Sequence, residues 1–122
     1  MGQVLFFYME HFMKRKEKET ISSIFEELGF SIDLQDECID FYQYTPCGED
    51  WHMSVSYDGT LISFLSEFLE LETYFDPDEE ALLWAHSLGK NGVPNSLQAL
   101  LDDAKWKQVQ LKKLAKEFSK IV

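Results

Sequence analysis

Cys47, Glu49 and His52 are the closest approach in this sequence to a nucleophile with a base beside it. A cysteine attacks as its thiolate, so a catalytic cysteine needs a neighbouring group that lowers the pKa of its thiol. These three residues are near one another only along the chain, and the sequence around them does not indicate an activated thiol. We therefore expect no catalytic residues and predict that the protein is not an enzyme.

Asp76, Asp78, Glu79 and Glu80 form a dense run of carboxylates that invites a calcium interpretation. A calcium loop, however, alternates its ligands around a central glycine and closes with a distant glutamate. Here the acids surround Pro77, which is typical of a helix start. There an N-terminal aspartate caps the helix and later carboxylates complement its dipole. Helix capping is thus the expected role of this run.

The remaining metal ligands are sparse. His11, His52 and His86 are too scattered for a zinc site, and Cys38 and Cys47 have no metal-binding spacing. We expect neither a metal nor a cofactor. No apolar run approaches the roughly 18 residues of a membrane span. Together with the two cysteines, too few for a disulfide framework, this predicts a cytoplasmic protein without a membrane partner.

The distribution of charge is the most unusual feature of the sequence. The net charge is −11, yet residues 20–89 contain no Lys or Arg and 16 acidic residues. The flanks, residues 1–19 and 90–122, are both slightly basic. Lys and Arg normally make up about half of the charged residues of a domain, so this gap is not expected by chance.

A surface of one sign has physical consequences. It repels nucleic acid and anionic membranes, and it attracts basic proteins, including those that bind nucleic acid. Self-repulsion lowers stability, so such a field is kept where it has a use. Two other interpretations stay open: the acids serve solubility, or they dock on the chain's own basic C-terminal helix.

The hydrophobic pattern predicts one helix followed by three strands. Apolar residues recur at helical spacing from Ile21 to Leu28, which predicts a helix over about 17–28, with a start near Phe6 as an alternative. Gly29 then ends it. Period-two alternation predicts strands over residues 30–34, 39–42 and 51–57, the last two joined as a hairpin through residues 45–50.

Three further helices follow in the pattern. Thr60 caps the first, Asp76 caps the second, which buries Ala81, Trp84, Ala85 and Leu88, and Asn95 caps the third with Gln98 completing a capping box. The last helix has an inner face of eight apolar residues: Leu97, Leu100, Leu101, Ala104, Leu111, Leu114, Phe118 and Ile121. Its predicted outer face carries six lysines: Lys105, Lys107, Lys112, Lys113, Lys116 and Lys120.

The fold class predicted from this order is α+β. We expect a three-stranded antiparallel meander covered by about four helices, with a long C-terminal helix. The length fits one domain over residues 1–122, with residues 1–12 as an alternative N-terminal extension.

Three segments carry a family resemblance. They are residues 42–51 (YQYTPCGEDW), 75–84 (FDPDEEALLW) and 93–104 (VPNSLQALLDDA). The pattern resembles small acidic proteins encoded by bacterial mobile elements such as phages, plasmids and conjugative elements. The resemblance covers about residues 38–110 and implies a genetic setting, without an assigned activity or functional residues.

The expected function is therefore a non-enzymatic module that binds a basic protein. One form would be an inhibitor of a host defence nuclease that mimics nucleic acid, as anti-restriction and anti-CRISPR proteins do; no direct contact with nucleic acid is expected. The alternative is a self-associating accessory protein, for example a homodimer. The predicted partner-binding residues are Asp40, Tyr42, Tyr44, Glu49, Asp50, Asp58, Glu67, Glu70, Glu72, Asp76, Asp78, Glu79 and Glu80. For Tyr42 and Tyr44, coverage by a further helix is an open alternative.

Overall fold

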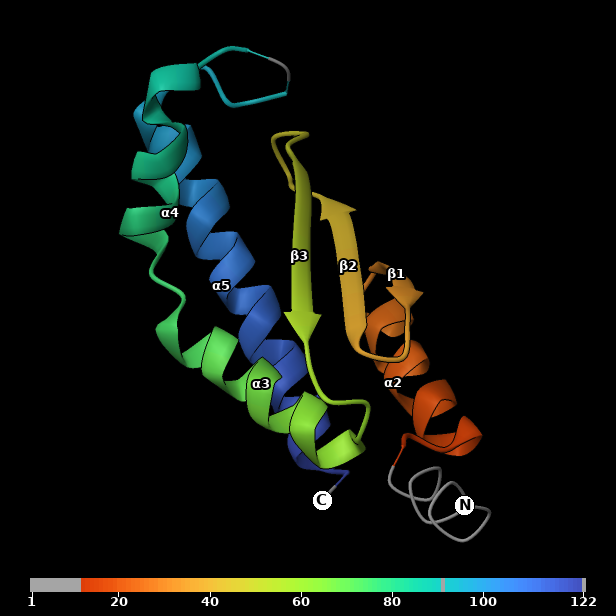
Figure 1. Cartoon of the computed structure of the whole chain (residues 1–122). Helices are drawn as coiled ribbons and strands as arrows, with labels where there is room; N and C mark the ends of the chain where they lie inside the picture. Colours follow the sequence, from red (N-terminus) through yellow and green to blue (C-terminus); the bar gives the residue numbers. More distant parts are fainter. Residues whose placement is uncertain (1–11, 91, 122) are drawn as a thin grey trace, which may run out of the picture.

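The computed structural model describes residues 12–90 and 92–121 and has the predicted α+β architecture (Figure 1). Helix α2 (Arg15–Glu27) precedes strands β1 (Ser31–Leu34), β2 (Cys38–Tyr44) and β3 (Asp50–Ser56). Helices α3 (Leu61–Tyr74) and α4 (Pro77–Trp84), a 3₁₀ turn (Ala85–Ser87) and the long helix α5 (Leu97–Ser119) follow. The possible start near Phe6, and all but the last residue of the possible extension 1–12, lie outside the described residues.

The three strands form an antiparallel sheet in the order β1-β2-β3. The predicted hairpin is confirmed, with the register running without interruption from Cys38 opposite Ser56 to Tyr44 opposite Asp50. Because side chains alternate along a strand, Ile39, Phe41, Trp51 and Val55 share one face of the sheet and are buried there. Gln43 and Met53 lie on the same face and are half-buried, and the side chains of the even-numbered residues of β2 and β3 point away from the helices.

Helices α2, α3 and α5 cover this apolar face, and phenylalanines from every layer meet in the core. The ring of Phe25 on α2 lies 4.8 Å from that of Phe41 on β2 and 5.3 Å from that of Phe118 on α5. Phe64 and Phe68 of α3 complete the cluster. Edge-to-face contacts of this kind add to the energy of burying large apolar rings, so one core unites all these elements.

Helix α4 packs against the first half of α5, away from the main core (Figure 1). A second, smaller apolar cluster of Ala81, Leu100 and Ala104 joins the two helices. Trp84 was predicted to be buried here but is exposed. The reason is that the side of α4 facing α5 runs through Pro77, Ala81 and Ala85, with Glu80 also turned inward, which places Trp84 on its rim.

Two of the three predicted helix caps are confirmed, and the third lies one residue later than predicted. Thr60 and Asp76 cap α3 and α4 as predicted. At α5 the cap is Ser96, whose hydroxyl accepts from the amide of Ala99; the predicted Asn95–Gln98 box is wrong. Since the helix begins one residue later than expected, Leu97 occupies its exposed first turn and Gln98 instead donates to Asp102.

Candidate functional site: the uncovered face of the sheet and the carboxylates around it

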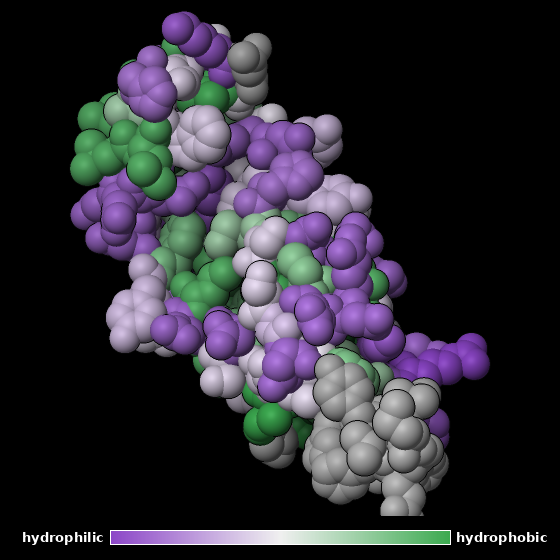
Figure 2. Space-filling view, in the orientation of Figure 1, coloured by the Kyte–Doolittle hydropathy of each residue, from purple (hydrophilic) through white to green (hydrophobic). Residues whose placement is uncertain are grey.

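No described helix covers the side of the sheet opposite the core. We call this the outer sheet face; it consists of Ser31, Asp33, Cys38, Asp40, Tyr42, Tyr44, Asp50, His52, Ser54 and Ser56. Tyr44 is 72% exposed and Tyr42 lies at the surface, so the alternative in which a further helix covers both tyrosines is wrong for the described chain. In Figure 2 hydrophilic side chains gather over the part of the surface where the strands lie.

Neighbouring strands organise the outer sheet face through cross-strand pairs. Tyr42 and His52 lie opposite each other and stack, with ring centroids 4.9 Å apart and planes 11° from parallel. His52 Nε2 also lies 3.1 Å from the carboxylate of Asp50. Tyr44 stands opposite Asp50 in the register. The face therefore combines flat aromatic rings with carboxylates, and it carries no Lys or Arg.

Asp40 occupies the middle of this face and is half-buried. Its carboxylate accepts hydrogen bonds from the hydroxyl of Ser54 and, at 3.6 Å, from the thiol of Cys38. Partial burial and the negative charge of Asp40 raise the pKa of the Cys38 thiol. Because these bonds fix the carboxylate, Asp40 presents a charge of set position to anything that approaches the face.

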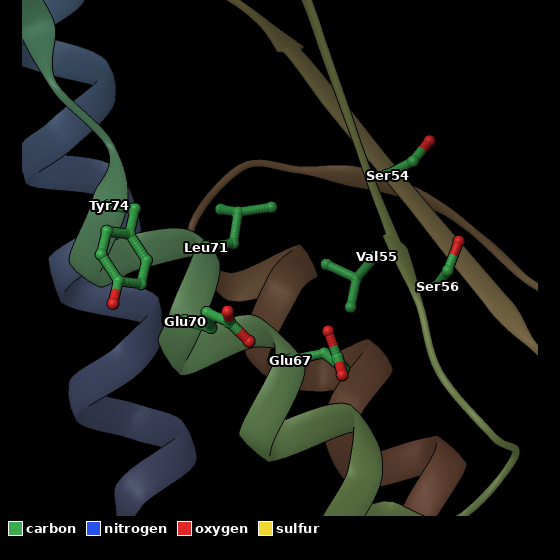
Figure 3. A pocket seen from close by; sticks show the side chains of 7 residues that line it. All are labelled: Ser54, Val55, Ser56, Glu67, Glu70, Leu71 and Tyr74. Atoms are coloured by element: carbon green, nitrogen blue, oxygen red, sulfur yellow. The ribbon is translucent and has the colours of Figure 1, made fainter.

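The carboxylates of α3 lie in a different place. Glu67 and Glu70 are exposed and line a groove between α3 and β3, whereas Glu72 is half-buried. In Figure 3 both glutamates project from the helix toward the space between it and the strand. These two residues thus place negative charge along the side of β3.

Two predicted binding residues serve local structure. The carboxylate of Asp76 accepts the amide of Asp78 at 3.0 Å and caps α4, as the capping interpretation predicted; Asp78 and Glu79 lie exposed in the first turn. Asp58 accepts both the amide (3.0 Å) and the hydroxyl (2.7 Å) of Thr60. The hydrogen bonds from the Thr60 hydroxyl and amide lower the pKa of Asp58.

Glu49 and Glu80, which were predicted to bind a partner, instead pair with a lysine of the same chain. Glu49 is buried, and its Oε1 lies 2.8 Å from Nζ of Lys107; Oε1 of Glu80 lies 3.1 Å from the same ammonium. Lys107 is only 1% exposed, so its predicted place on the outer face of α5 is wrong, although the five other lysines of that face are exposed. Two acids therefore do dock on the chain's own basic helix.

The helical spacing of Lys107 predicts its burial, but the residue was assigned to the outer face because it is charged. Position 107 lies three residues after Ala104 and four before Leu111, on the same helical stripe as the apolar core positions. Charged residues are seldom fully buried unless they are paired. Its partners come from segments 27 and 58 residues away, and no local pattern identifies them.

Next to this ion cluster lies a second buried contact that the sequence did not predict. The hydroxyl of Thr45 donates to the carboxylate of Asp103 at 2.5 Å and accepts the amide of Glu49 at 3.0 Å. Thr45 and Asp103 are both buried. Two contacts therefore join the turn between β2 and β3 to α5: the hydrogen bond from Thr45 to Asp103 and the ion pair of Glu49 with Lys107.

The structure separates Cys47, Glu49 and His52. Glu49 turns inward to Lys107. His52 lies three residues later, and because side chains alternate between the two faces of a sheet, its ring lies on the outer sheet face. Loss of water around the sulfur and its hydrogen bond with Asp103 raise the pKa of the Cys47 thiol. This direction is opposite to the one that a nucleophilic cysteine requires.

The predicted acids do not form one patch. The exposed ones occupy four places: the outer sheet face, the groove between α3 and β3, the turn at Asp58 before α3, and the start of α4. Glu49 lies in the interior. Among residues 12–90 and 92–121, no three His, Cys, Asp or Glu side chains are grouped so that they could hold a metal ion. Within the same residues, no helix has both the length and the apolar character needed to span a membrane.

No protein-family model matches this chain, and neither a curated protein nor a solved structure is significantly similar to it.

Proposed function

We propose that this protein is a non-enzymatic binding module whose outer sheet face engages a basic surface of another protein. The observation that carries the proposal is the composition of that face. It lacks a covering helix in the described chain, it presents Asp33, Asp40 and Asp50 beside Tyr42 and Tyr44, and it contains no Lys or Arg. Tyrosine is enriched at the centres of protein interfaces, and an acidic rim steers a basic partner toward it.

The lysines of the protein support the same orientation. The helical layer lies on the far side of the sheet from the outer sheet face, and it contains the exposed lysines of α5 and the four basic residues at the start of α2, Lys14, Arg15, Lys16 and Lys18. The outer sheet face carries carboxylates and no Lys or Arg, whereas the helical layer carries charges of both signs. Repulsion of a basic partner by lysines is therefore confined to the helical layer. Nucleic acid is repelled by the outer sheet face.

Mimicry of nucleic acid is the mode of binding that we would test first, with an enzyme that binds nucleic acid as the partner. The resemblance to proteins of mobile elements makes a defence nuclease a sensible target. Carboxylates on a rigid sheet can occupy the places of phosphates on such an enzyme. Duplex DNA should then compete with this protein for its partner. Binding that is indifferent to DNA would mean that the carboxylates engage another basic surface.

The experiment is affinity capture from a bacterial lysate at low salt, followed by elution in a salt gradient. The test variant is Asp33→Asn with Asp50→Asn, both exposed on the outer sheet face. The matched control is Glu26→Gln with Glu27→Gln, both exposed on α2, which changes the net charge equally. We expect the test variant to release the partner at lower salt than the wild type and the control, because exposed charge pairs are screened. Equal elution of all three proteins would overturn the proposal.

Self-association is a second candidate function, favoured by one observation. Leu82, Leu83 and Trp84 are exposed side by side on α4, and Figure 2 shows hydrophobic colour gathered at the end of the molecule where α4 lies. A second copy could cover them while its α5 lysines approach the acids at the start of α4. Light scattering at high protein concentration and low salt tests this: a strict monomer removes the candidate.

A further inference from the structure

Strand β3 forms an edge of the sheet, and its outer side has no strand partner in the described chain. Thr45 donates its amide to Glu49 at 2.9 Å, and Tyr57 donates its amide to Glu37 at 3.0 Å. Since bonding alternates along an antiparallel pair, the odd-numbered residues of β3 bond to β2. The amides and carbonyls of His52, Ser54 and Ser56 therefore point outward, and no backbone hydrogen bond joins them to another described element.

This edge lacks the devices that usually prevent strands from pairing with other chains. Natural edge strands are commonly short, bulged, or protected by lysine or proline. The opposite edge strand, β1, is short, with four residues. Strand β3 has seven residues, an uninterrupted register, and neither Lys nor Pro. Its backbone is consequently free to accept a further strand.

A groove of about 310 Å³ runs beside this edge, between β3 and α3. Figure 3 shows Leu71 and Val55 facing the groove from opposite sides, with Glu67 and Glu70 along the helix. In the same view the side chains of Ser54 and Ser56 point away from α3. The groove thus combines an apolar interior with negative charge on its helical wall.

We propose that an extended, basic segment of a partner protein pairs with the outer edge of β3 as a fourth strand. This inference rests on the proposed function and specifies how the partner is held. Strand addition draws affinity from main-chain hydrogen bonds and specificity from the pockets that receive alternate side chains. Here the alternate side chains that enter the groove meet Glu67 and Glu70, so Lys or Arg is selected at those positions.

Long basic side chains fit both parts of the groove. Their methylene stems can lie along Leu71 and Val55 while the charged ends reach the glutamates, as such side chains do at many apolar surfaces. The side chains on the other side of the added strand would extend the outer sheet face beside His52 and Ser54. One bound segment would therefore contact both acidic regions that β3 separates.

The test uses a fluorescent seven-residue peptide of alternating Lys and Val, matched in length to β3, with its affinity measured by fluorescence anisotropy. Two protein variants isolate the backbone. Ser54→Pro removes an outward amide that β2 does not use, and proline is tolerated where an edge amide faces solvent. Ser54→Ala keeps the amide and removes only the hydroxyl. Because both variants lose the hydroxyl that bonds to Asp40, Ser54→Ala is the reference for Ser54→Pro. Relative to Ser54→Ala, we expect Ser54→Pro to weaken binding about tenfold or more, since one lost hydrogen bond and the clash of the ring disturb the pairing.

Two N-methylated peptides provide a test that does not depend on the folding of a variant. One carries methyl groups on the first, third, fifth and seventh amides, the other on the second, fourth and sixth. In a strand added to β3 only one of these sets faces the protein. One peptide should lose binding and the other keep it. Equal affinity of both modified peptides and the unmodified one would overturn strand addition, as would unchanged binding to folded Ser54→Pro.

The charge of the groove is tested by Glu67→Gln with Glu70→Gln, for which Glu26→Gln with Glu27→Gln is again the control. The groove variant should weaken peptide binding and reduce its salt dependence. Failure of this inference differs from failure of the proposed function. If Ser54→Pro holds peptide and captured partner as the wild type does, while Asp33→Asn with Asp50→Asn loses the partner, strand addition is wrong and the acidic face remains.

Discussion

The ammonium of Lys107 and the carboxylate of Glu49 form an ion pair inside the protein, 2.8 Å apart, with both side chains almost completely buried. Glu49 lies at the turn of the β2–β3 hairpin and Lys107 in the middle of α5, so the pair joins the sheet to its covering helix. The ammonium also lies 5.9 Å from the ring of Trp51. The pair therefore helps to hold the hairpin that carries the outer sheet face.

We expect Lys107→Met to destabilise the fold by about 3–5 kcal/mol, because it leaves Glu49 buried without its partner. Urea denaturation measures the change, and Lys105→Met, at an exposed position of the same helix, should change the free energy of unfolding by less than about 0.5 kcal/mol. The double variant Lys107→Met with Glu49→Leu should recover most of the loss, since the two almost completely buried charges are removed and only Glu80, which is partly exposed, is left without its partner. Equal stability of Lys107→Met and Lys105→Met would contradict the structure.

Thr45→Val tests the second link between the hairpin and α5. The substitution keeps the shape of the side chain but removes the hydroxyl that donates to Asp103 and accepts from the amide of Glu49. Leaving a buried polar group without its partner costs about 1–3 kcal/mol. Thr20→Val is the control, because its hydroxyl bonds only locally, to the carbonyl of Lys16 on the surface of α2. A Thr45 variant no less stable than the control would show that the bond to Asp103 is not formed.

Gly59→Ala should be more destabilising than Gly48→Ala. Both glycines have positive φ, +97° and +87°, where an added Cβ is strained by roughly 1–2 kcal/mol. At Gly59 the new Cβ would also lie 2.2 Å from the ring of Phe12, whereas at Gly48 it meets open space. The difference in melting temperature between the variants measures the steric part alone. Equal melting temperatures would mean that Phe12 does not pack on this turn.

The turn at Asp58 should make a pH-dependent contribution to stability. The pKa of Asp58 is lower in the folded chain than in the unfolded chain because the ionised carboxylate accepts the hydroxyl and amide of Thr60. Its contribution is therefore fully present above the unfolded pKa, near 4, and is lost as the pH falls through the folded pKa. The wild type should exceed Asp58→Asn in melting temperature at neutral pH, and the difference should shrink in acid. Glu27→Gln, at an exposed helical position, serves as the control. A difference that does not vary with pH would contradict this assignment.

The order of the elements and most of their boundaries could be predicted from the sequence, because both depend on neighbouring residues. Helical spacing around Ile21 and Phe25 and alternation around Trp51 and Val55 mark the faces that are buried. The caps at Thr60 and Asp76 bond to amides two or three residues away. The same alternation placed Tyr42 and Tyr44 on the face away from the core, but whether a further helix covers that face was left open by the sequence.

The exposure of the carboxylates in the acidic segment does not depend on neighbouring residues alone. The sequence determined that residues 20–89 carry only negative charge, but tertiary structure decided which carboxylates reach solvent. Glu49 and Asp50 are neighbours in the sequence but differ in exposure. Glu49 pairs with Lys107 in the interior, whereas Asp50 is exposed on the outer sheet face. Burial of a charge depends on a partner that cancels its loss of water. For Glu49 that partner lies 58 residues away, so only the packing of α5 against the hairpin could decide it.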